Sequence, residues 1–305
     1  MRIVVLLLLV SLVSTASLKV LVTGAGGRTG KAVFQTLKAE YQNVEPIGLV
    51  RSNKAAKVLK KAGAEPSEIV RADVTNTDEL SLCMQGCDTV ILCTSAVPKI
   101  KPLSIAKVMF KKMILRSKDA GRPRFRFSPG GTPQEVDWMG SKLQIDAAVA
   151  AGVRKFVLIS SMGGTQPDNF LNSIGKQADG SGGDILLWKR KAERYLMQTD
   201  LDYTIIHPGG LVDECPRARA LIVGVDDELL LQLTSRQVPR NDVARVACAA
   251  MSAPKASKLS FDLASKPIGE GTPTDLTPDF FAMLGGKSCG YTDEPIEPPS
   301  LPSLQ

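Results

Sequence analysis

A glycine-rich turn near the start of the chain could bind phosphate groups. Gly24, Gly27 and Gly30 lie in the stretch GAGGRTG, which joins an apolar run directly to a helical pattern. The first glycine permits a tight turn, the second lets the backbone approach a pyrophosphate, and the third allows close packing of helix and strand. Free N–H groups at a helix start bind anions. We therefore expect the backbone around Arg28 and Thr29 to hold a dinucleotide; a plain strand-to-helix turn is the alternative.

The residue after the second apolar run is expected to select the nucleotide. An acid there would accept hydrogen bonds from the ribose hydroxyl of NAD. This chain has Arg51 instead, whose guanidinium matches a 2′-phosphate through paired, charge-assisted bonds. Arg28 could reach the same phosphate from the other side. The sequence therefore favours NADP as the cofactor, unless both arginines are ordinary solvated surface charges.

Two further groups of residues end apolar runs at positions where a dinucleotide is usually held. Asp73 and Val74 follow the third run and would lie by the adenine. Thr94, Ser95 and Ala96 follow the fourth and would lie by the ribose and pyrophosphate. Asp73 could equally be a helix cap for the segment after it.

These residues depend on a regular alternation of strands and helices. Apolar runs rich in β-branched residues predict strands at 18–23, 46–50, 68–71, 89–93, 155–159, 203–207 and 258–263. Helical spacing predicts helices at 31–39, 54–62, 78–84, 136–151, 185–198 and 241–252. Such βαβ units form a Rossmann-type α/β fold, a doubly wound parallel sheet with helices on both faces. The polar stretch 160–183 is expected to be a loop at the carboxyl edge, where ligands bind.

Longer stretches of the chain resemble a known family. They are VTGAGGRTGKAV, VDWMGSKLQIDAA, GVRKFVLISSMGGTQPDN, LLWKRKAERYL, YTIIHPGGLVDE and VPRNDVARV. Through them the chain resembles the atypical short-chain dehydrogenase/reductases (SDR), specifically their NmrA-like NAD(P)-binding group. It looks most similar to small plant NAD(P)-binding proteins and to the dinucleotide-binding domain of a chloroplast inner-envelope translocon component. The resemblance implies a Rossmann fold that binds NADP.

The resemblance also implies a catalytic arrangement, one part of which is missing. Active family members use a serine after the fifth strand and a Tyr-x-x-x-Lys pair on the next helix. Ser160 and Ser161 match the serine position and Lys191 the lysine, so Ser161 and Lys191 are the catalytic candidates, with Lys191 also holding the nicotinamide ribose. The tyrosine position is Leu187, which cannot transfer a proton, and Tyr195 lies a turn too far along. Without the resemblance, a surface lysine is an equally good interpretation of Lys191.

His207 is the third catalytic candidate. It is the one histidine of the sequence and ends the sixth predicted strand. An imidazole bordering the nicotinamide could move a proton near neutral pH. A structural histidine with satisfied hydrogen bonds is the alternative, because no partner is evident from the sequence.

The two ends of the chain differ from its body. Residues 1–16 combine a basic start, an apolar run and small residues before a cleavage site, which is typical of a signal peptide; an uncleaved anchor or a misplaced start codon is the alternative. Residues 17–288 are expected to form the single domain. Residues 289–305, with four prolines, are expected to be a disordered tail.

The cysteines bear on the compartment. Six cysteines show neither CxxC nor metal-ligand spacing, so no disulfide framework and no metal site are expected. Free thiols suit a reducing compartment. Passage through the secretory route into a plastid with extra membranes would reconcile them with a signal peptide.

Positive charge is concentrated in one segment. Between residues 99 and 126 there are ten basic residues and one acid, whereas the whole chain carries +7. The rest is slightly acidic, which gives no reason to expect nucleic-acid binding. An inserted helix at about 103–118 would place Ala106, Met109, Phe110 and Met113 on one face. It could lie on an anionic membrane or serve as a solvated lid over the site.

The sequence thus predicts an NADP(H)-binding protein of the atypical reductase type, with weak or no classical reductase activity and a role as a redox or cofactor sensor. One alternative is an NADPH-dependent oxidoreductase acting on a small carbonyl or quinone, with His207 or a water replacing the missing tyrosine. Another is a membrane-associated scaffold that uses the basic helix.

Overall fold

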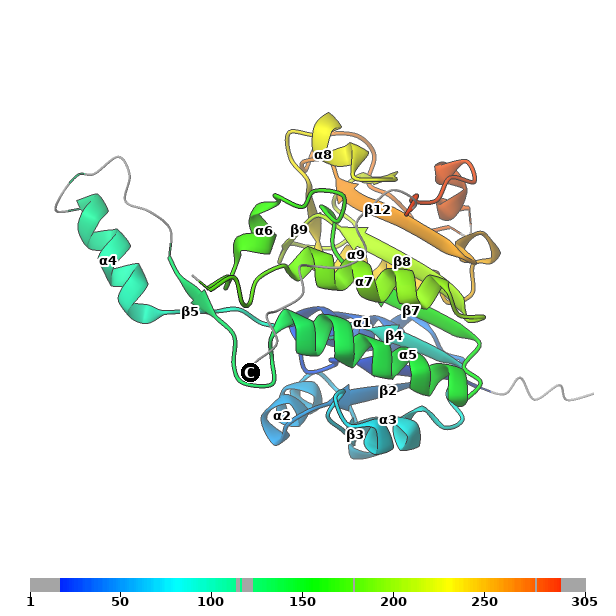
Figure 1. Ribbon diagram of the computed structural model, residues 1–305. Helices are drawn as coiled ribbons and strands as arrows, with labels where there is room; N and C mark the ends of the chain where they lie inside the picture. Colours follow the sequence, from blue (N-terminus) through cyan, green and yellow to red (C-terminus); the bar gives the residue numbers. More distant parts are fainter. Residues whose placement is uncertain (1–16, 114–115, 117–122, 178, 278, 292–305) are drawn as a thin grey trace, which may run out of the picture.

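An eight-stranded sheet with helices on both faces forms the body of the chain (Figure 1). The computed structural model describes residues 17–113, 116, 123–177, 179–277 and 279–291. Neighbouring strands are parallel except β10 and β12. In spatial order the strands are β10 (Leu221–Gly224), β12 (Leu259–Ser265), β8 (Asp202–Pro208), β7 (Lys155–Ile159), β4 (Thr89–Leu92), β1 (Leu18–Thr23), β2 (Val44–Val50) and β3 (Ile69–Arg71). This confirms the predicted doubly wound Rossmann-type sheet.

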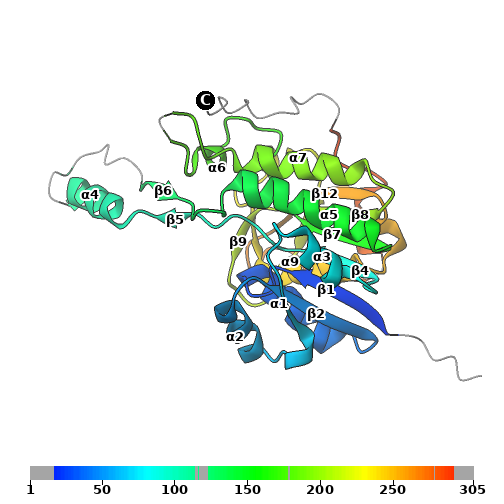
Figure 2. The same ribbon diagram turned by 60° about the horizontal axis from the view of Figure 1, so that its bottom comes forward.

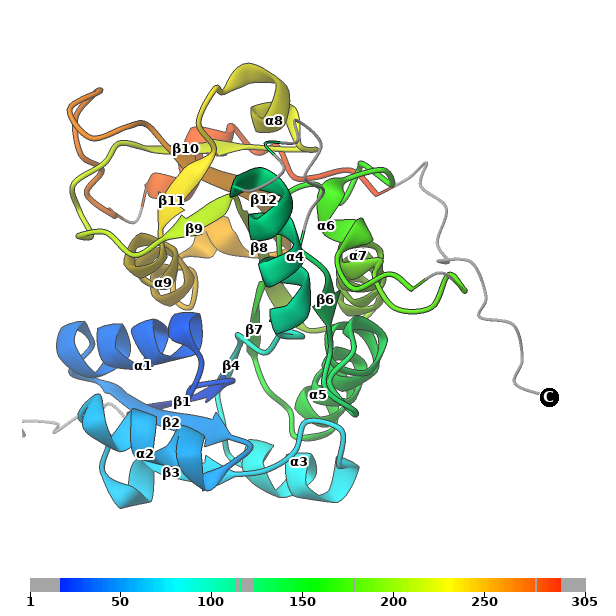
Figure 3. The ribbon, with the colours of Figure 1, turned by 90° about the vertical axis from the view of Figure 1, so that its left-hand side faces the viewer.

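Both faces of the sheet are covered because alternate side chains of each strand point to opposite sides. In β1, Val20 and Val22 enter the hydrophobic core on one face and Leu21 enters the core on the other. The first core packs against α1 (Arg28–Glu40), α2 (Asn53–Lys61) and α9 (Arg240–Ala249). The second packs against α3 (Thr77–Met84), α5 (Ser141–Ala150) and α7 (Ile185–Met197), as Figure 3 shows.

Several smaller elements complete the body. They are α6 (Phe170–Ser173), α8 (Glu228–Gln232), the parallel pair β9 (Gly210–Val212) and β11 (Gln237–Pro239), and the 3-10 turns Pro66–Glu68, Pro254–Ala256 and Phe280–Leu284. A π-helical stretch, Gln134–Gly140, precedes α5. The single helix expected over 136–151 is therefore two segments of different winding.

The basic segment forms an arm on the body (Figure 2). A two-stranded ribbon, β5 (Lys99–Ile100) and β6 (Phe125–Arg126), carries α4 (Pro102–Met113) away from the sheet. Part of the predicted 103–118 helix lies outside the described residues. Among the described residues, none of the helices is long and apolar enough to cross a bilayer.

The ends of the described chain bear on the predicted boundaries. The predicted signal peptide, 1–16, lies outside the described residues. The predicted tail begins at 289, but Cys289 and Tyr291 are buried, and the N–H of Cys289 donates to the Ser260 carbonyl. The domain therefore extends at least to Tyr291. The proline-rich remainder of the predicted tail lies outside the described residues.

Candidate functional site

The glycine turn joins β1 to α1 at the carboxyl edge of the sheet, where the strand order reverses between β1 and β4. Gly24 has a φ of +65°, which favours glycine. A Cβ on Gly30 would lie 2.4 Å from the Gly24 carbonyl oxygen, so the helix can approach the turn this closely only without a side chain. A Cβ on Gly27 would meet nothing within 4 Å except that same oxygen, at 3.1 Å. The outer side of Gly27 is therefore open.

The start of α1 is well suited to an anion. Its first N–H groups have no intrahelical partners, no side chain in the described chain caps them, and its first turn holds no acid. Two guanidiniums lie beside it. Arg28 pairs with Asp213, which also accepts a bond of 2.8 Å from Arg240 Nε, and Arg240 donates to Thr29 Oγ1 at 2.9 Å. Arg240 and Asp213 were not predicted; both lie in stretches shared with the family, but nothing local indicated their role.

The predicted cofactor residues that follow β2 and β3 are Arg51, Asp73 and Val74, and only Arg51 is exposed. Arg51 is exposed at the end of β2, directly before Ser52, the N-cap of α2. Asp73 instead holds its own turn, because its Oδ1 accepts bonds from the amide and hydroxyl of Thr75. Asn76, not Asp73, caps α3. Val74 is buried beside the position that a Cβ of Gly140 would take, so it packs within the protein.

The residues after β4 lie against the helix layer. Gln144 Nε2 donates to Thr94 Oγ1 at 3.2 Å, and the Ala96 amide donates to Asp137 at 3.3 Å. Gln144 Oε1, and Thr23 Oγ1 at the end of β1, are buried with no hydrogen-bond partner in the described part of the chain. Unsatisfied polar atoms at this edge fit a site that takes a polar ligand.

A lysine on α7 does enter this edge, but it is Lys189 and not the predicted Lys191. Lys189 Nζ lies 2.7 Å from Asp137 Oδ1, with side chains 13% and 0% exposed. Both residues line a small pocket together with Thr94 and Ser160. The ammonium of Lys191 lies over the rings of Trp138 and Trp188 instead.

The phase of α7 explains this difference. Residues two apart on a helix point about 200° away from each other, so Lys189 and Lys191 cannot both face the sheet edge. The residue four before Lys189 is Ile185, and four before Lys191 is Leu187. A tyrosine is absent at both positions. Of the tyrosines in the described chain, Tyr195 bonds Asp146 at 2.5 Å and none lines the Lys189 pocket.

The two serines after β7 also differ from each other. Ser161 Oγ donates to the carbonyl of the adjacent Met162 at 3.2 Å. Ser160 lines the pocket with Lys189, and its hydroxyl donates to Glu193. Ser160, and not the predicted Ser161, therefore connects the pocket to the interior.

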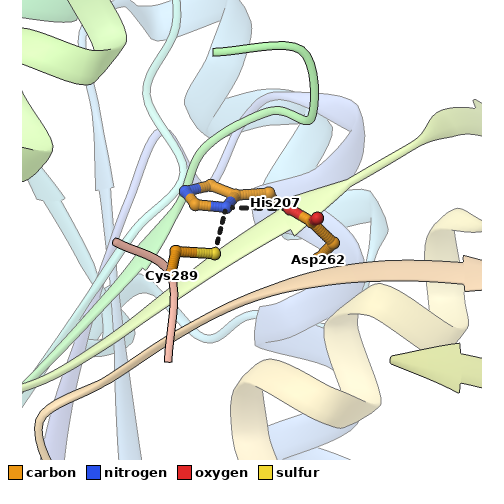
Figure 4. Close-up of side chains that lie close together, drawn as sticks. All are labelled: His207, Asp262 and Cys289. Atoms are coloured by element: carbon orange, nitrogen blue, oxygen red, sulfur yellow. Dashed lines mark hydrogen bonds and ion pairs between the residues drawn. The ribbon is translucent and has the colours of Figure 1, made fainter. Parts of the chain in front are cut away.

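His207 is buried among ionisable groups (Figure 4). Its Nε2 lies 3.1 Å from Glu193 Oε2, and its Nδ1 lies 3.2 Å from Asp262 Oδ1 and 3.7 Å from Cys289 Sγ. Tyr291 Oη donates to Glu193 Oε2 at 2.9 Å. In the described structure this network lies behind the pocket, and Ser160 joins the two.

The charges in this network set each other's ionisation. Burial raises the pKa of Glu193, but His207 and Arg190 outweigh burial and lower the pKa to about 2. Burial lowers the pKa of His207, but Glu193, Asp262 and Cys289 outweigh burial and hold the pKa well above its usual value. The imidazole contacts Glu193 on one side and Asp262 on the other. It does not line the Lys189 pocket, where the predicted proton carrier would have to lie.

Comparison with known proteins agrees with this fold. The profile of the NAD(P)H-binding family matches residues 24–254. The chain belongs to the NAD(P)H-binding family. It is 43% identical over 271 residues to an uncharacterized chloroplastic protein of Arabidopsis thaliana, covering 89% of this chain and 76% of the relative. It is 39% identical over 277 residues to the sanguinarine reductase of Eschscholzia californica, covering 89% and 96%.

The NAD(P)H-binding fold also recurs in solved structures. A Bacillus halodurans protein described as an NAD-dependent epimerase/dehydratase superposes with a TM-score of 0.61. The alignment covers 84% of this chain and 96% of that one, at 23% identity. This likeness concerns the fold alone. Together these comparisons confirm the predicted family resemblance and an oxidoreductase-like, NAD(P)-binding protein.

Proposed function

We propose that this protein binds NADP(H) and reduces an electron-poor acceptor. The observation that carries this proposal is the uncapped start of α1, open at Gly27 and flanked by the guanidiniums of Arg28 and Arg240. Backbone N–H groups and a helix dipole at that point suit a pyrophosphate. Lys189 lies at the same edge, where it can hold the nicotinamide ribose.

The preference for NADP rests on Arg51 and Arg28. The end of β2 carries no acid to accept bonds from a ribose hydroxyl, and Arg51 is exposed there. Arg28 is engaged by Asp213, and its side chain is 68% exposed, so it is free to turn toward a phosphate at little cost.

The reaction type follows from the missing tyrosine. Bound NADPH supplies a hydride. The side chains at the pocket that carry exchangeable protons are Thr94, Ser141, Ser160 and Lys189, with Asp137 held as the partner of Lys189. Among the described residues that line this pocket there is no tyrosine to donate a proton. Acceptors that need such a positioned acid at the moment of hydride transfer are therefore disfavoured. Quinones and other electron-poor acceptors, which stabilise the incoming charge themselves, suit the site better than simple carbonyls.

Two further observations support a reductase. The relative from Eschscholzia californica, similar over nearly the whole chain, is a sanguinarine reductase. A second pocket of about 310 Å³ lies between the base of the arm and the 175–184 loop, and its lining includes Phe127 and Trp188. Aromatic side chains there suit a flat, conjugated acceptor.

The test is NADPH oxidation by the purified protein with a panel of quinones and simple aldehydes. Steady turnover with quinones, and at least about tenfold less with aldehydes, is expected because the positioned acid is absent. Equal turnover with both classes would contradict the assignment. Tight NADPH binding without any turnover would favour the cofactor-sensor role instead.

Cofactor selection gives a separate prediction. In the Arg51→Glu variant, NADPH affinity should fall at least about tenfold, because a carboxylate replaces the cation that is proposed to face the 2′-phosphate. NADH affinity should change little or rise. Calorimetry with each nucleotide measures both. Lys54→Glu, an equal charge change three residues along on exposed α2, is the control; an equal effect there would show that only net charge matters.

A second role, membrane contact, is favoured by the arm. On α4, Leu103, Met109, Phe110 and Met113 are exposed and lie on one helix face. Lysines are interspersed in the same segment. Exposed apolar residues beside basic ones suit the surface of an anionic bilayer.

Replacing Phe110 and Met113 together by serine tests this role. Binding to vesicles containing anionic lipid should fall at least about tenfold, since two apolar anchors are lost. NADPH binding should be unchanged. Flotation against neutral and anionic vesicles measures the effect, and equal flotation of variant and wild type would favour the lid over the membrane.

The cellular site of this activity is proposed to be a plastid reached through the secretory route. A chloroplastic relative and the predicted signal peptide at 1–16 support this. Imaging of the full chain fused at its C-terminus to a fluorescent protein would locate it.

A further inference from the structure

Three metal-ligand side chains converge inside the protein, outside the pocket described above. His207 comes from β8, Asp262 from the neighbouring strand β12, and Cys289 from the segment that follows the last 3-10 turn (Figure 4). Their donor atoms lie within 4.8 Å of one another, and the residues are 3%, 1% and 5% exposed. We propose that these three residues bind a Zn²⁺ ion, whose fourth tetrahedral position a water molecule would fill.

The spacing of the donor atoms suits tetrahedral zinc. Zinc bonds of about 2.0 to 2.3 Å place neighbouring donors about 3.3 to 3.6 Å apart. His207 Nδ1 lies 3.2 Å from Asp262 Oδ1 and 3.7 Å from Cys289 Sγ. The third pair of donor atoms, from Asp262 and Cys289, lies within 4.8 Å. Thiolate, imidazole and carboxylate together favour zinc over the hard cations Mg²⁺ and Ca²⁺.

Hydrogen bonding from Nδ1 can serve these two neighbours only by sharing one proton. Nδ1 can carry one proton at most, yet it faces both a carboxylate oxygen and a sulfur. A metal ion would engage all three donors at once. The charges of one thiolate and one carboxylate would also balance those of Zn²⁺, which matters at a buried site.

The surroundings orient these ligands as in known metal sites. A metal-bound imidazole usually donates its other N–H to a carboxylate, and His207 Nε2 lies 3.1 Å from Glu193 Oε2. Asp262 Oδ2 accepts the Asp227 amide at 2.7 Å, and Cys289 Sγ accepts the Asp226 amide at 3.3 Å. Each negatively charged ligand therefore has a backbone donor of its own.

Zinc here would fasten the C-terminal segment to the sheet. It would also fix the Asp226–Asp227 turn, whose Asp227 carboxylate holds the loop after β7 through the amides of Gly163 and Thr165. The ligands come from positions 207, 262 and 289, so their spacing in the sequence gives no metal motif.

The experiment is metal analysis of the full chain, unfolded with chelator and refolded with Zn²⁺, because a buried site takes up metal as it closes. We expect about one zinc per chain after gel filtration, and a fall of at least about tenfold in Cys289→Ser. Cys215→Ser, which changes an exposed cysteine, should retain the zinc. Chelator should lower the Tm of the wild type and of Cys215→Ser but not that of Cys289→Ser.

Cobalt gives a readout that does not depend on any variant folding. Co²⁺ bound at this site should show a sulfur-to-metal charge-transfer band and the visible bands of tetrahedral coordination. Refolded wild type without stoichiometric zinc and without these bands would overturn the proposal, as would full zinc content in both Cys289→Ser and Asp262→Asn. Neither readout involves NADPH, so the result is independent of the proposed function.

Discussion

Replacing Lys189 by methionine is expected to lower NADPH-dependent quinone reduction by at least about 100-fold, the usual scale for losing one preorganised charge at a reaction site. The ammonium is partly buried at the carboxyl edge, 2.7 Å from Asp137, and Lys189 lines the pocket with Thr94 and Ser160. Methionine keeps the length of the side chain and removes its charge. NADPH affinity should fall in the same variant, because the ribose loses its donor.

Lys191→Met is the matched comparison, since it makes the same change two residues away on the same helix. Its ammonium lies over Trp138 and Trp188, so turnover should change less than about twofold. Values of kcat and KM for both variants, with NADPH binding by fluorescence, measure the difference. If Lys191→Met lost activity and Lys189→Met kept it, the motif-based assignment would be correct and the structural one wrong.

Removing Lys189 also leaves the Asp137 carboxylate buried without its cation, which could reduce activity through stability alone. The double variant Lys189→Met with Asp137→Asn removes both charges and so avoids a lone buried charge. Its unfolding free energy should recover toward that of the wild type, whereas its turnover should not. Recovery of turnover in the double variant would show that Lys189 acts structurally.

The choice between the two lysines shows why the site was only partly predictable. Helical spacing identified α7 correctly, but matching a Tyr-x-x-x-Lys pattern that lacks its tyrosine leaves the register open. A shift of two residues along a helix places the side chain on the opposite face of the helix. The bonds between Lys189 and Asp137, and between Ser160 and Glu193, fix the register, and they depend on packing of α7 against its neighbours.

The fold was more predictable than the site because βαβ alternation is a local pattern. Buried strands such as β1 and β7 have the predicted bounds. Three of the strands that sequence reasoning missed, β9, β10 and β11, have three or four residues each and are defined by their pairing. Prolines after Tyr291 likewise concealed that Cys289 and Tyr291 are part of the core.

The partners of His207 could not be predicted for the same reason. They lie 14, 55 and 82 positions away, at Glu193, Asp262 and Cys289. No spacing rule connects residues contributed by a helix, a strand and a C-terminal segment. The contacts of His207 fit the alternative prediction, a structural histidine with satisfied hydrogen bonds. The convergence of Asp262 and Cys289 on its Nδ1 adds the proposed metal site.

Glu193→Gln is expected to destabilise the fold by about 3 to 5 kcal/mol, the cost of breaking a buried charge network by removing one member. The Glu193 carboxylate accepts bonds from Ser160 and Tyr291 and faces both His207 and Arg190, which lies 3.4 Å away. An amide keeps the shape of the side chain but removes the anion that His207 and Arg190 share. Urea denaturation followed by circular dichroism measures the loss.

Glu228→Gln makes the same change on the exposed first turn of α8 and should cost less than about 0.5 kcal/mol. Glu193→Gln should also lower turnover, because Ser160 at the pocket would lose its anionic acceptor. If the two variants unfolded at the same urea concentration, the network would contribute no more to the free energy of unfolding than a surface charge does. The connection that we draw from the buried interior through Glu193 and Ser160 to the Lys189 pocket would then have no energetic basis.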